Sequence, residues 1–282
     1  MIVVHGDRIE ALAGAIVGSL NNILVSHIEG GEISGTIDET MRHAVTKLSH
    51  IHFVANTIAK KRLIQLGENK NYIFIIGSPD IDIMLSNRLP TLDFAKKRYD
   101  INFNSYALFI YHPVTTEPNK IENNITNMVN ALIKSNIKYI VLFPNNDMGS
   151  NTILKEYKRL EDNPNFKIFP SMRFECFLTL LKNSSFIIGN SSAGIREAPI
   201  YGVPTINLGT RQQGRTINKQ VININEKEDL IIKTIENMGN NRIKPVKEFG
   251  EGNSCEKFYK ILLNKEIWNI SPQKMFIDID EI

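Results

Sequence analysis

Three acidic side chains near the start of the chain have the types and spacing that proton transfer requires. Asp7 follows the apolar run IVVH at 2–5, and Glu29 follows the run ILVSHI at 23–28. Asp38 lies further along the same HIEGGEISGTIDE segment as Glu29. Carboxyl groups gathered in one site can serve as general base and general acid in a single reaction. We therefore expect these residues to remove and deliver protons on a bound ligand.

Each of these acids has a structural alternative. Asp38 opens a helix predicted over 38–50, where an N-cap role alone would explain it. Asp7 precedes a helix predicted over 8–22 and can cap it in the same way. Glu29 is harder to explain structurally, because the two glycines after it let a ligand approach the backbone closely.

A second motif, GNSSAGIREAP at 189–199, has the composition of a phosphate-binding turn. It follows a predicted strand and leads into a helix expected to open near Ala193. Backbone N–H groups at a helix N-terminus, together with the hydroxyls of Ser191 and Ser192, suit a diphosphate. Glu197 is placed to accept hydrogen bonds from ribose hydroxyls. A plain capped helix is the alternative interpretation of this segment.

Two further segments carry candidate ligand contacts. Arg211 and Arg215, in GTRQQGR, follow the next predicted strand and either clamp a phosphate or lie on the surface. His112, in YHPVTTE, closes the first strand of the second half and is a candidate phosphate contact. No His, Cys or Asp spacing resembles a zinc site, and no EF-hand motif is present. These spacings therefore give no sign of a zinc or calcium site.

The elements that must position these groups alternate between strands and helices. Residues 2–77 give a βαβαβ pattern, a linker with one short helix follows over 79–105, and a second alternating series comes after it. This pattern predicts parallel strands with right-handed crossovers and ligands bound beyond the carboxyl ends of the strands. We expect a first lobe over 1–95, a second over 96–265, and a C-terminal segment over 266–282 that packs back on the first.

The composition is that of an ordinary globular protein. With 42% apolar and 22% charged residues, 282 residues suffice for two lobes with their own cores. The net charge of +3 comes from scattered basic residues and does not favour nucleic-acid binding. No run of about 20 apolar residues suggests a membrane span, and no signal peptide is visible. The two cysteines have no paired spacing, so a cytoplasmic location is expected.

Seven motifs follow one another along the chain in this order: HGDR, HIEGGEISGTIDE-x-x-RH, KLSHIHFVAN, YHPVTTE, FPNND-x-GS, GNSSAGIREAP and GTRQ-x-GR. In sequence and order they closely resemble the motifs of the hydrolysing UDP-N-acetylglucosamine 2-epimerases of sialic acid biosynthesis. The resemblance covers essentially the whole chain. It implies an α/β protein of the GT-B type, with two Rossmann-like doubly wound lobes and the active site between them. It also implies a homo-oligomer, either a dimer or a tetramer.

The resemblance implies a reaction in two stages. UDP-GlcNAc loses UDP by anti elimination, which leaves 2-acetamidoglucal, and water then adds across the double bond to yield ManNAc with C2 inverted. Asp7, Glu29 and Asp38 match the family's essential acids, which share C2 proton abstraction, C2 reprotonation and water activation. No metal or redox cofactor is implied, so the leaving-group charge would be met by helix dipoles, hydroxyls and arginine.

The same resemblance implies substrate contacts in both lobes. The positions that match ligand or phosphate contacts in the family are Arg8, His112, Asn145, Ser191, Ser192 and Arg211, and Glu197 matches the ribose contact.

One departure from the family is large. Full-length members carry a glycine-rich turn and further strands before the HGDR motif, about ninety residues by general fold size. We therefore expect an incomplete first lobe, as in a truncated or mis-started gene product or a fragment. Such a lobe would expose a strand edge and apolar faces. Activity of the isolated chain does not follow from the resemblance.

Other functions remain compatible with the motifs. Relatives that act on UDP-diNAc sugars in the legionaminic acid and bacillosamine pathways are close competitors. The non-hydrolysing epimerases share the fold but carry a different acidic segment. A GT-B glycosyltransferase would explain a nucleotide-sugar site but leaves the three acids without a role. A non-catalytic module that binds UDP or a UDP-sugar is the remaining alternative.

Overall fold

The computed structural model describes residues 1–33, 37–212, 221–238 and 242–278. The chain forms two α/β units, each with its own parallel sheet: unit 1 comprises Met1–Asn87 and Lys247–Ile282, and unit 2 comprises Arg88–Val246. The predicted α/β class with parallel sheets is confirmed. The units divide after residues 87 and 246, whereas the sequence suggested divisions after 95 and 265.

The described sheet of unit 1 has the strand order β1-β2-β3-β4, with all neighbours parallel. Its strands are β1 Ile2–His5, β2 Val25–Ile28, β3 Ile51–Val54 and β4 Ile73–Ile75. Its helices are α1 Ile9–Leu20, α2 Ile37–Leu48, α3 Thr57–Gln65, α4 Pro79–Met84 and α10 Ser254–Leu262.

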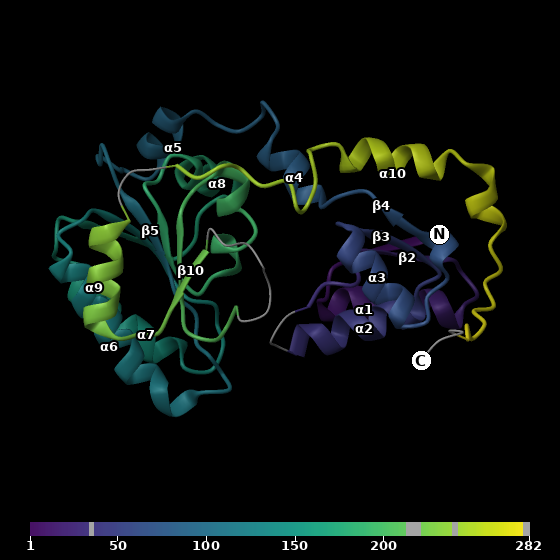
Figure 1. Ribbon diagram of the computed structural model, residues 1–282, viewed down its shortest axis with the longest axis horizontal. Helices are drawn as coiled ribbons and strands as arrows, with labels where there is room; N and C mark the ends of the chain where they lie inside the picture. Colours follow the sequence, from purple (N-terminus) through teal and green to yellow (C-terminus); the bar gives the residue numbers. More distant parts are fainter. Residues whose placement is uncertain (34–36, 213–220, 239–241, 279–282) are drawn as a thin grey trace. The chain divides into compact units, whose positions relative to one another are not determined.

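Helices cover both faces of the unit 1 sheet (Figure 1). On one face, α1 and α2 pack on the strands through a cluster that includes Ala15, Val25 and Val45. On the other face, α10 packs on β3, and the rings of Phe53 and Phe258 meet edge to face with their centroids 4.6 Å apart. Alternating strand residues therefore face two apolar layers, which explains why these strands read as nearly continuous apolar runs.

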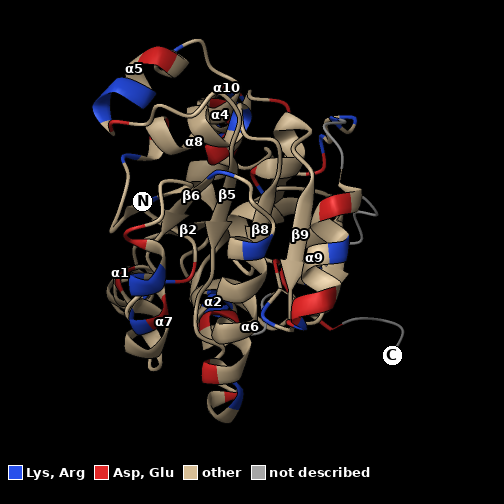
Figure 2. Ribbon diagram, turned by 90° about the vertical axis from the view of Figure 1, so that its left-hand side faces the viewer, with Lys and Arg blue, Asp and Glu red and all other residues tan. Residues whose placement is uncertain are grey.

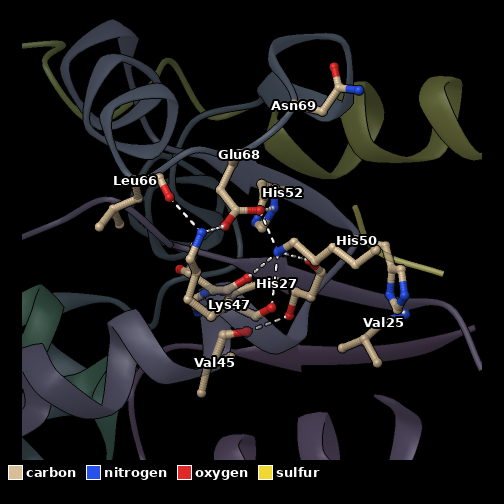
Figure 3. A network of polar contacts seen from close by, with 12 residues as sticks. Val25, His27, Val45, Lys47, His50, His52, Leu66, Glu68 and Asn69 are labelled. Atoms are coloured by element: carbon tan, nitrogen blue, oxygen red, sulfur yellow. Dashed lines mark hydrogen bonds and ion pairs between the residues drawn. The ribbon is translucent and has the colours of Figure 1, made fainter. Parts of the chain in front are cut away.

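The chain after α10 is anchored to unit 1 by a buried polar network (Figure 3). The ammonium of Lys274 donates to carbonyl groups around the C-terminus of α2, including that of Ser49 at 2.7 Å. It also lies 2.5 Å from the carboxylate of Glu68, which accepts from His52 at 3.0 Å and Lys47 at 2.9 Å. A cation at this position satisfies carbonyls that a helix end leaves without partners.

Glu68 is ionised at the centre of this network. Its burial raises the pKa, but the hydrogen bond from His52 and the charge of Lys274 outweigh that effect and bring the pKa to about 2. Burial lowers the pKa of His52, so its ring stays neutral and its Nε2–H donates to the carboxylate. The negative charge is therefore compensated by the two lysines.

The described sheet of unit 2 has the strand order β10-β9-β8-β5-β6-β7, again with parallel neighbours. Its strands are β5 Ala107–Ile110, β6 Tyr139–Leu142, β7 Phe166–Phe169, β8 Ile187–Gly189, β9 Thr205–Leu208 and β10 Val221–Ile224. Its α-helices are α5 Leu92–Arg98, α6 Ile121–Lys134, α7 Ser150–Tyr157, α8 Phe174–Lys182 and α9 Glu228–Asn237.

The strand order of unit 2 reverses between β5 and β8. The chain runs from β5 outward to β7 on one side and then returns to β8 on the other. Such a switch point leaves a crevice at the carboxyl ends of the two central strands, where open α/β sheets bind ligands. The core beside it is large: α6, α7 and α9 pack on the sheet around buried side chains such as Phe109, Val129 and Ile231.

Three local features differ from the sequence predictions. The linker expected over 79–105 contains two helices, α4 and α5. The edge strand β10 was not predicted, because its sequence VINI is short and includes a polar residue. The helix expected to open near Ala193 is instead two short 3-10 turns, Ser192–Gly194 and Ala198–Tyr201, because Pro199 lacks the N–H that a continuous helix needs.

Among the described helices, none is long and apolar enough to cross a bilayer. On the side seen in Figure 2, helices such as α5 and α9 carry both acidic and basic residues, with acidic residues in the first turn of each. Strand β1 is an edge of the unit 1 sheet, and Val3, Val17 and Leu20 on β1 and α1 are exposed.

Candidate functional site

Two of the predicted acids lie at the same edge of the unit 1 sheet. β1 and β2 are paired in register with His5 opposite Ile28, and the Gly6 N–H donates to the Ile28 carbonyl at 3.0 Å. Asp7 and Glu29 each come just after these strands, at their carboxyl ends. The paired strands therefore bring both residues to the same edge of the sheet, which is the edge at which open α/β sheets bind ligands.

Asp7 is held by a buried arginine from α2. The guanidinium of Arg42 forms an ion pair with the Asp7 carboxylate and also donates to the Glu32 carbonyl at 2.9 Å. Arg42 is only 4% exposed, whereas the Asp7 side chain keeps 24% of its surface open to solvent. The buried guanidinium therefore fixes the orientation of the Asp7 carboxylate, and the exposed part of this side chain remains accessible to a ligand.

Glu29 occupies an unusual backbone conformation. Its φ is +67°, in the left-handed region that few residues other than glycine adopt. The side chain is buried, accepts a hydrogen bond from the Ser78 hydroxyl, and lies 3.2 Å from Nε2 of His5. Non-glycine residues in this region cluster at functional sites, so the conformation and burial together make Glu29 a candidate site residue.

Asp38 lies on the same helix as Arg42, one turn earlier. The helix begins at Ile37, so Asp38 is inside the first turn and not at the N-cap position that the sequence suggested. Its carboxylate still complements the positive end of the helix dipole. Arg42 thus connects the helix that carries Asp38 to the turn that carries Asp7.

A buried histidine braces the turn before Asp7. The Nε2 of His27 donates to the Gly6 carbonyl at 2.9 Å, and its Nδ1 accepts from the Thr46 hydroxyl at 3.1 Å. Burial lowers the pKa of His27 to about 3, so the ring is neutral at physiological pH. His27 is therefore a fully buried structural residue.

In unit 2, candidate residues gather at the switch point. His112 follows β5, and its Nδ1 accepts from the backbone N–H of Asn145, which follows β6, at 3.0 Å. Burial, and to a smaller extent the charge of Arg211, lower the pKa of His112 to about 4. The guanidinium of Arg211, from the loop after β9, donates to the Asn190 carbonyl at 3.1 Å. The side-chain Oδ1 of Asn145 is buried and has no hydrogen-bond partner within the described residues.

The serine motif occupies the end of β8 in the same unit. Ser191 accepts a hydrogen bond from the Ala193 N–H at 3.3 Å, so it caps the first 3-10 turn. Ser192 begins that turn and is half-buried, and Glu197 lies just before the second turn. The short turns supply fewer aligned N–H groups than the predicted helix, so the hydroxyls and Arg211 carry more of any anion binding.

Two predicted residues remain, Arg8 and Arg215. Arg8 is exposed and stands at the N-cap of α1, beside Asp7. Arg215 lies outside the described residues. Sequence reasoning missed Arg42, Ser78 and Asn190 as site residues; Ser78 follows β4, where the strand-end rule would have found it. Within the described part of the chain, no group of three or more His, Cys, Asp or Glu side chains could hold a metal ion.

Comparison with known proteins gives a consistent result. Residues 1–263 match the sequence model of a family described as UDP-N-acetylglucosamine 2-epimerase. The chain is similar to a UDP-N-acetylglucosamine 2-epimerase of Neisseria meningitidis serogroup B, with 46% identity over 99% of this chain and 75% of that protein. It is also similar to a UDP-N,N'-diacetylbacillosamine 2-epimerase (hydrolyzing) of Legionella pneumophila, with 36% identity over 93% of this chain and 70% of that protein.

A solved structure agrees in fold. The crystal structure of Methanocaldococcus jannaschii UDP-GlcNAc 2-epimerase in complex with UDP-GlcNAc and UDP matches with a TM-score of 0.74 and 28% identity. The match covers 92% of this chain and 74% of that one.

Proposed function

This chain belongs to the UDP-N-acetylglucosamine 2-epimerase family, and we propose that it is a hydrolysing member that converts UDP-GlcNAc and water to ManNAc and UDP. ManNAc is a precursor for sialic acid or a related nonulosonic acid. The observation that carries the proposal is the pair of carboxylates, Asp7 and Glu29, at adjacent strand ends, each with its own fixed polar partner. Similarity to a Legionella enzyme whose name specifies hydrolysis supports the same reaction type.

In the proposed elimination, a carboxylate removes the proton from C2 of the sugar. The C1–O bond breaks, its electron pair leaves with the β-phosphate of UDP, and a C1–C2 double bond remains. Fixed donors that meet charge on the departing phosphate lower the barrier to this step. Arg211 and His112 in unit 2 supply such donors, and Ser191 and Ser192 add hydroxyls.

In the proposed hydration, a carboxyl group delivers a proton to C2 from the opposite face, while a second carboxylate takes a proton from water as the water oxygen adds at C1. Atoms balance as UDP-GlcNAc plus water giving ManNAc plus UDP. Asp7 and Glu29 suit this division between an acid and a base because their partners differ. The Asp7 carboxylate is paired with a guanidinium, whereas the Glu29 carboxylate accepts from a hydroxyl. Asp38 is the third candidate for these steps.

Product analysis by NMR tests the proposal against its alternatives. Purified protein incubated with UDP-GlcNAc should release ManNAc and UDP in equal amounts. UDP-ManNAc as the final product would indicate a non-hydrolysing epimerase, and UDP release that requires an added sugar acceptor would indicate a glycosyltransferase. UDP binding without turnover would indicate a binding module. A parallel incubation with UDP-N,N'-diacetylbacillosamine shows which of the two nucleotide sugars, this one or UDP-GlcNAc, the protein converts faster.

Substitution of the acids tests their assigned roles. Asp7→Asn, Glu29→Gln and Asp38→Asn should each lower turnover by about 100-fold or more, which is the typical contribution of a proton-transfer group. UDP affinity should change little, because the proposed phosphate contacts lie in unit 2. Glu39→Gln is the matched control, since Glu39 lies beside Asp38 but pairs with His43. Unchanged turnover in all three acid variants would refute the assignment.

A further inference from the structure

Asn190 is the most fully enclosed polar residue at the unit 2 switch point. It directly follows β8, and its side chain is buried with no exposed surface. The side-chain amide pairs with the backbone of His112: Oδ1 accepts from the His112 N–H at 2.7 Å, and Nδ2 donates to the His112 carbonyl at 2.8 Å. Two hydrogen bonds from one planar group fix both the position and the orientation of that backbone segment.

The backbone of Asn190 extends the connection to neighbouring loops. Its N–H donates to the Ile110 carbonyl at 3.1 Å, which continues the pairing of β5 and β8. Its carbonyl accepts from Arg211 at 3.1 Å and from Gln212 at 2.9 Å. One buried residue therefore joins the segments that follow β5, β8 and β9.

These contacts determine what His112 can offer to a ligand. Because Nδ1 accepts the Asn145 N–H, the proton of a neutral ring must be on Nε2. Burial keeps the ring neutral near pH 7, since it lowers the pKa to about 4. His112 can therefore donate a hydrogen bond through Nε2–H, but its other nitrogen is already occupied and cannot act as a base.

We propose that Asn190 is a positioning residue that holds His112 as an Nε2–H donor and holds Arg211 beside it, so that both face the diphosphate of the substrate. Asn190 itself does not touch the ligand. The inference rests on the proposed function, which supplies the diphosphate. Two donors fixed before the ligand arrives would meet the charge of the leaving phosphate without reorganisation.

Nitrogen-15 NMR of the six histidines tests the positioning role without a ligand. The wild-type chain should show His112 in the Nε2–H form at pH 7, with its signals identified through His112→Gln. In Asn190→Ala, the ring should show a mixture of tautomers. Asn190→Asp keeps an acceptor for the His112 N–H but places a second oxygen against the His112 carbonyl, so its effect should be intermediate.

Calorimetric titration with UDP gives a second, independent measure. Asn190→Ala should weaken UDP binding by about tenfold or more, because the His112 segment loses both side-chain hydrogen bonds that align it, whereas the backbone carbonyl that accepts from Arg211 remains. Asn207→Ala is the control: Asn207 is another buried amide in unit 2, 2% exposed, and donates to Asn223 at 2.8 Å. It should leave the UDP affinity and the His112 tautomer unchanged.

The two claims fail in different ways. A wild-type chain that binds no UDP contradicts the proposed function, whereas the tautomer comparison still decides whether Asn190 positions His112. Folded Asn190→Ala with wild-type tautomer and wild-type UDP affinity would overturn the inference. If Asn190→Ala does not fold, Asn190→Asp decides, and both properties unchanged in that variant would overturn it equally.

Discussion

Arg42 and Asp7, 35 residues apart in the chain, form an ion pair that joins helix α2 to the turn after strand β1. The arginine is buried and its carboxylate partner is partly open. Arg42 also anchors itself on the Glu32 carbonyl, so its guanidinium is fixed from two sides. The two partners are bound by two different nitrogens of one planar guanidinium, a fixed fork that the single nitrogen of a lysine does not reproduce.

We expect Arg42→Met to lower turnover by about 100-fold, because Asp7 would lose the group that orients it for proton transfer. Arg42→Lys should recover part of this loss, because an ammonium keeps a positive charge for Asp7 but lacks the rigid two-nitrogen fork of the guanidinium. Steady-state kinetics and UDP titration measure the two effects separately. UDP affinity should remain unchanged, and Arg159→Met, which removes an exposed partner of Glu156, is the control. Wild-type turnover in Arg42→Met would contradict a positioning role.

Ser78→Ala should lower turnover by about tenfold, because it removes the hydroxyl that donates to the buried carboxylate of Glu29. The same change should lower the free energy of unfolding by about 1–2 kcal/mol, since a buried charged group loses one partner. Kinetics and urea denaturation test the two expectations. Ser86→Ala provides the comparison, because the Ser86 hydroxyl donates to the Ile83 carbonyl, three residues earlier, at 2.9 Å in an exposed position. Equal effects of the two serine changes would argue against a specific role for Ser78.

Glu68→Gln should destabilise the chain at neutral pH and lose that effect in acid. The folded-state pKa of Glu68 is about 2, below its ordinary value of 4.5, so its ionised form stabilises the folded state above about pH 4.5. That stabilisation falls as the pH drops from about 4.5 toward 2. Denaturant titrations of both proteins across this range should therefore converge in acid. The exposed Glu251→Gln serves as control, and a pH-independent difference for Glu68→Gln would contradict the account.

Gly189→Ala should be severely destabilising. Gly189 has φ +134°, and an added Cβ would lie 1.9 Å from the Ile110 carbonyl oxygen, inside the pairing of β5 and β8. We expect a loss of more than about 3 kcal/mol or failure to fold. Gly6→Ala separates the cost of the positive φ from the cost of the collision. Gly6 also has a positive φ, +77°, but an added Cβ there meets nothing within 4 Å. Its cost should be about 1 kcal/mol in thermal or chemical unfolding. Equal costs would show that the collision is unimportant.

Much of the architecture followed from simple patterns in the sequence. Apolar runs marked the parallel strands, such as the one at 106–112, where both faces of the strand are covered. The run at 2–5 marked β1 as well, although its edge position leaves Val3 exposed. The strand-end rule then brought Asp7 and Glu29 together correctly. The short edge strand β10 lacked such a run, and the turns after Ser191 depended on how Pro199 interrupts a helix.

The hydrogen-bond and ion-pair partners of the site residues could not be predicted from the sequence. Arg42 stands four residues after Asp38 on an amphipathic helix, where an arginine is most simply interpreted as a surface residue. Its pairing with Asp7 depends on the crossing of a helix and a strand, which no local spacing encodes. Asn190 was visible inside a recognised motif, but its role depends on His112, 78 residues away. Polar pairs between residues this far apart in the chain can be identified only from the three-dimensional structure.

The central claim is that carboxylates of this chain remove a proton from C2 of the sugar and return one to the opposite face. Incubation of the protein with UDP-GlcNAc in D₂O, followed by proton NMR of the released sugar, tests this most directly. The account predicts ManNAc with deuterium at C2, formed together with an equal amount of UDP. ManNAc that retains its original C2 proton, or the absence of free ManNAc, would contradict it.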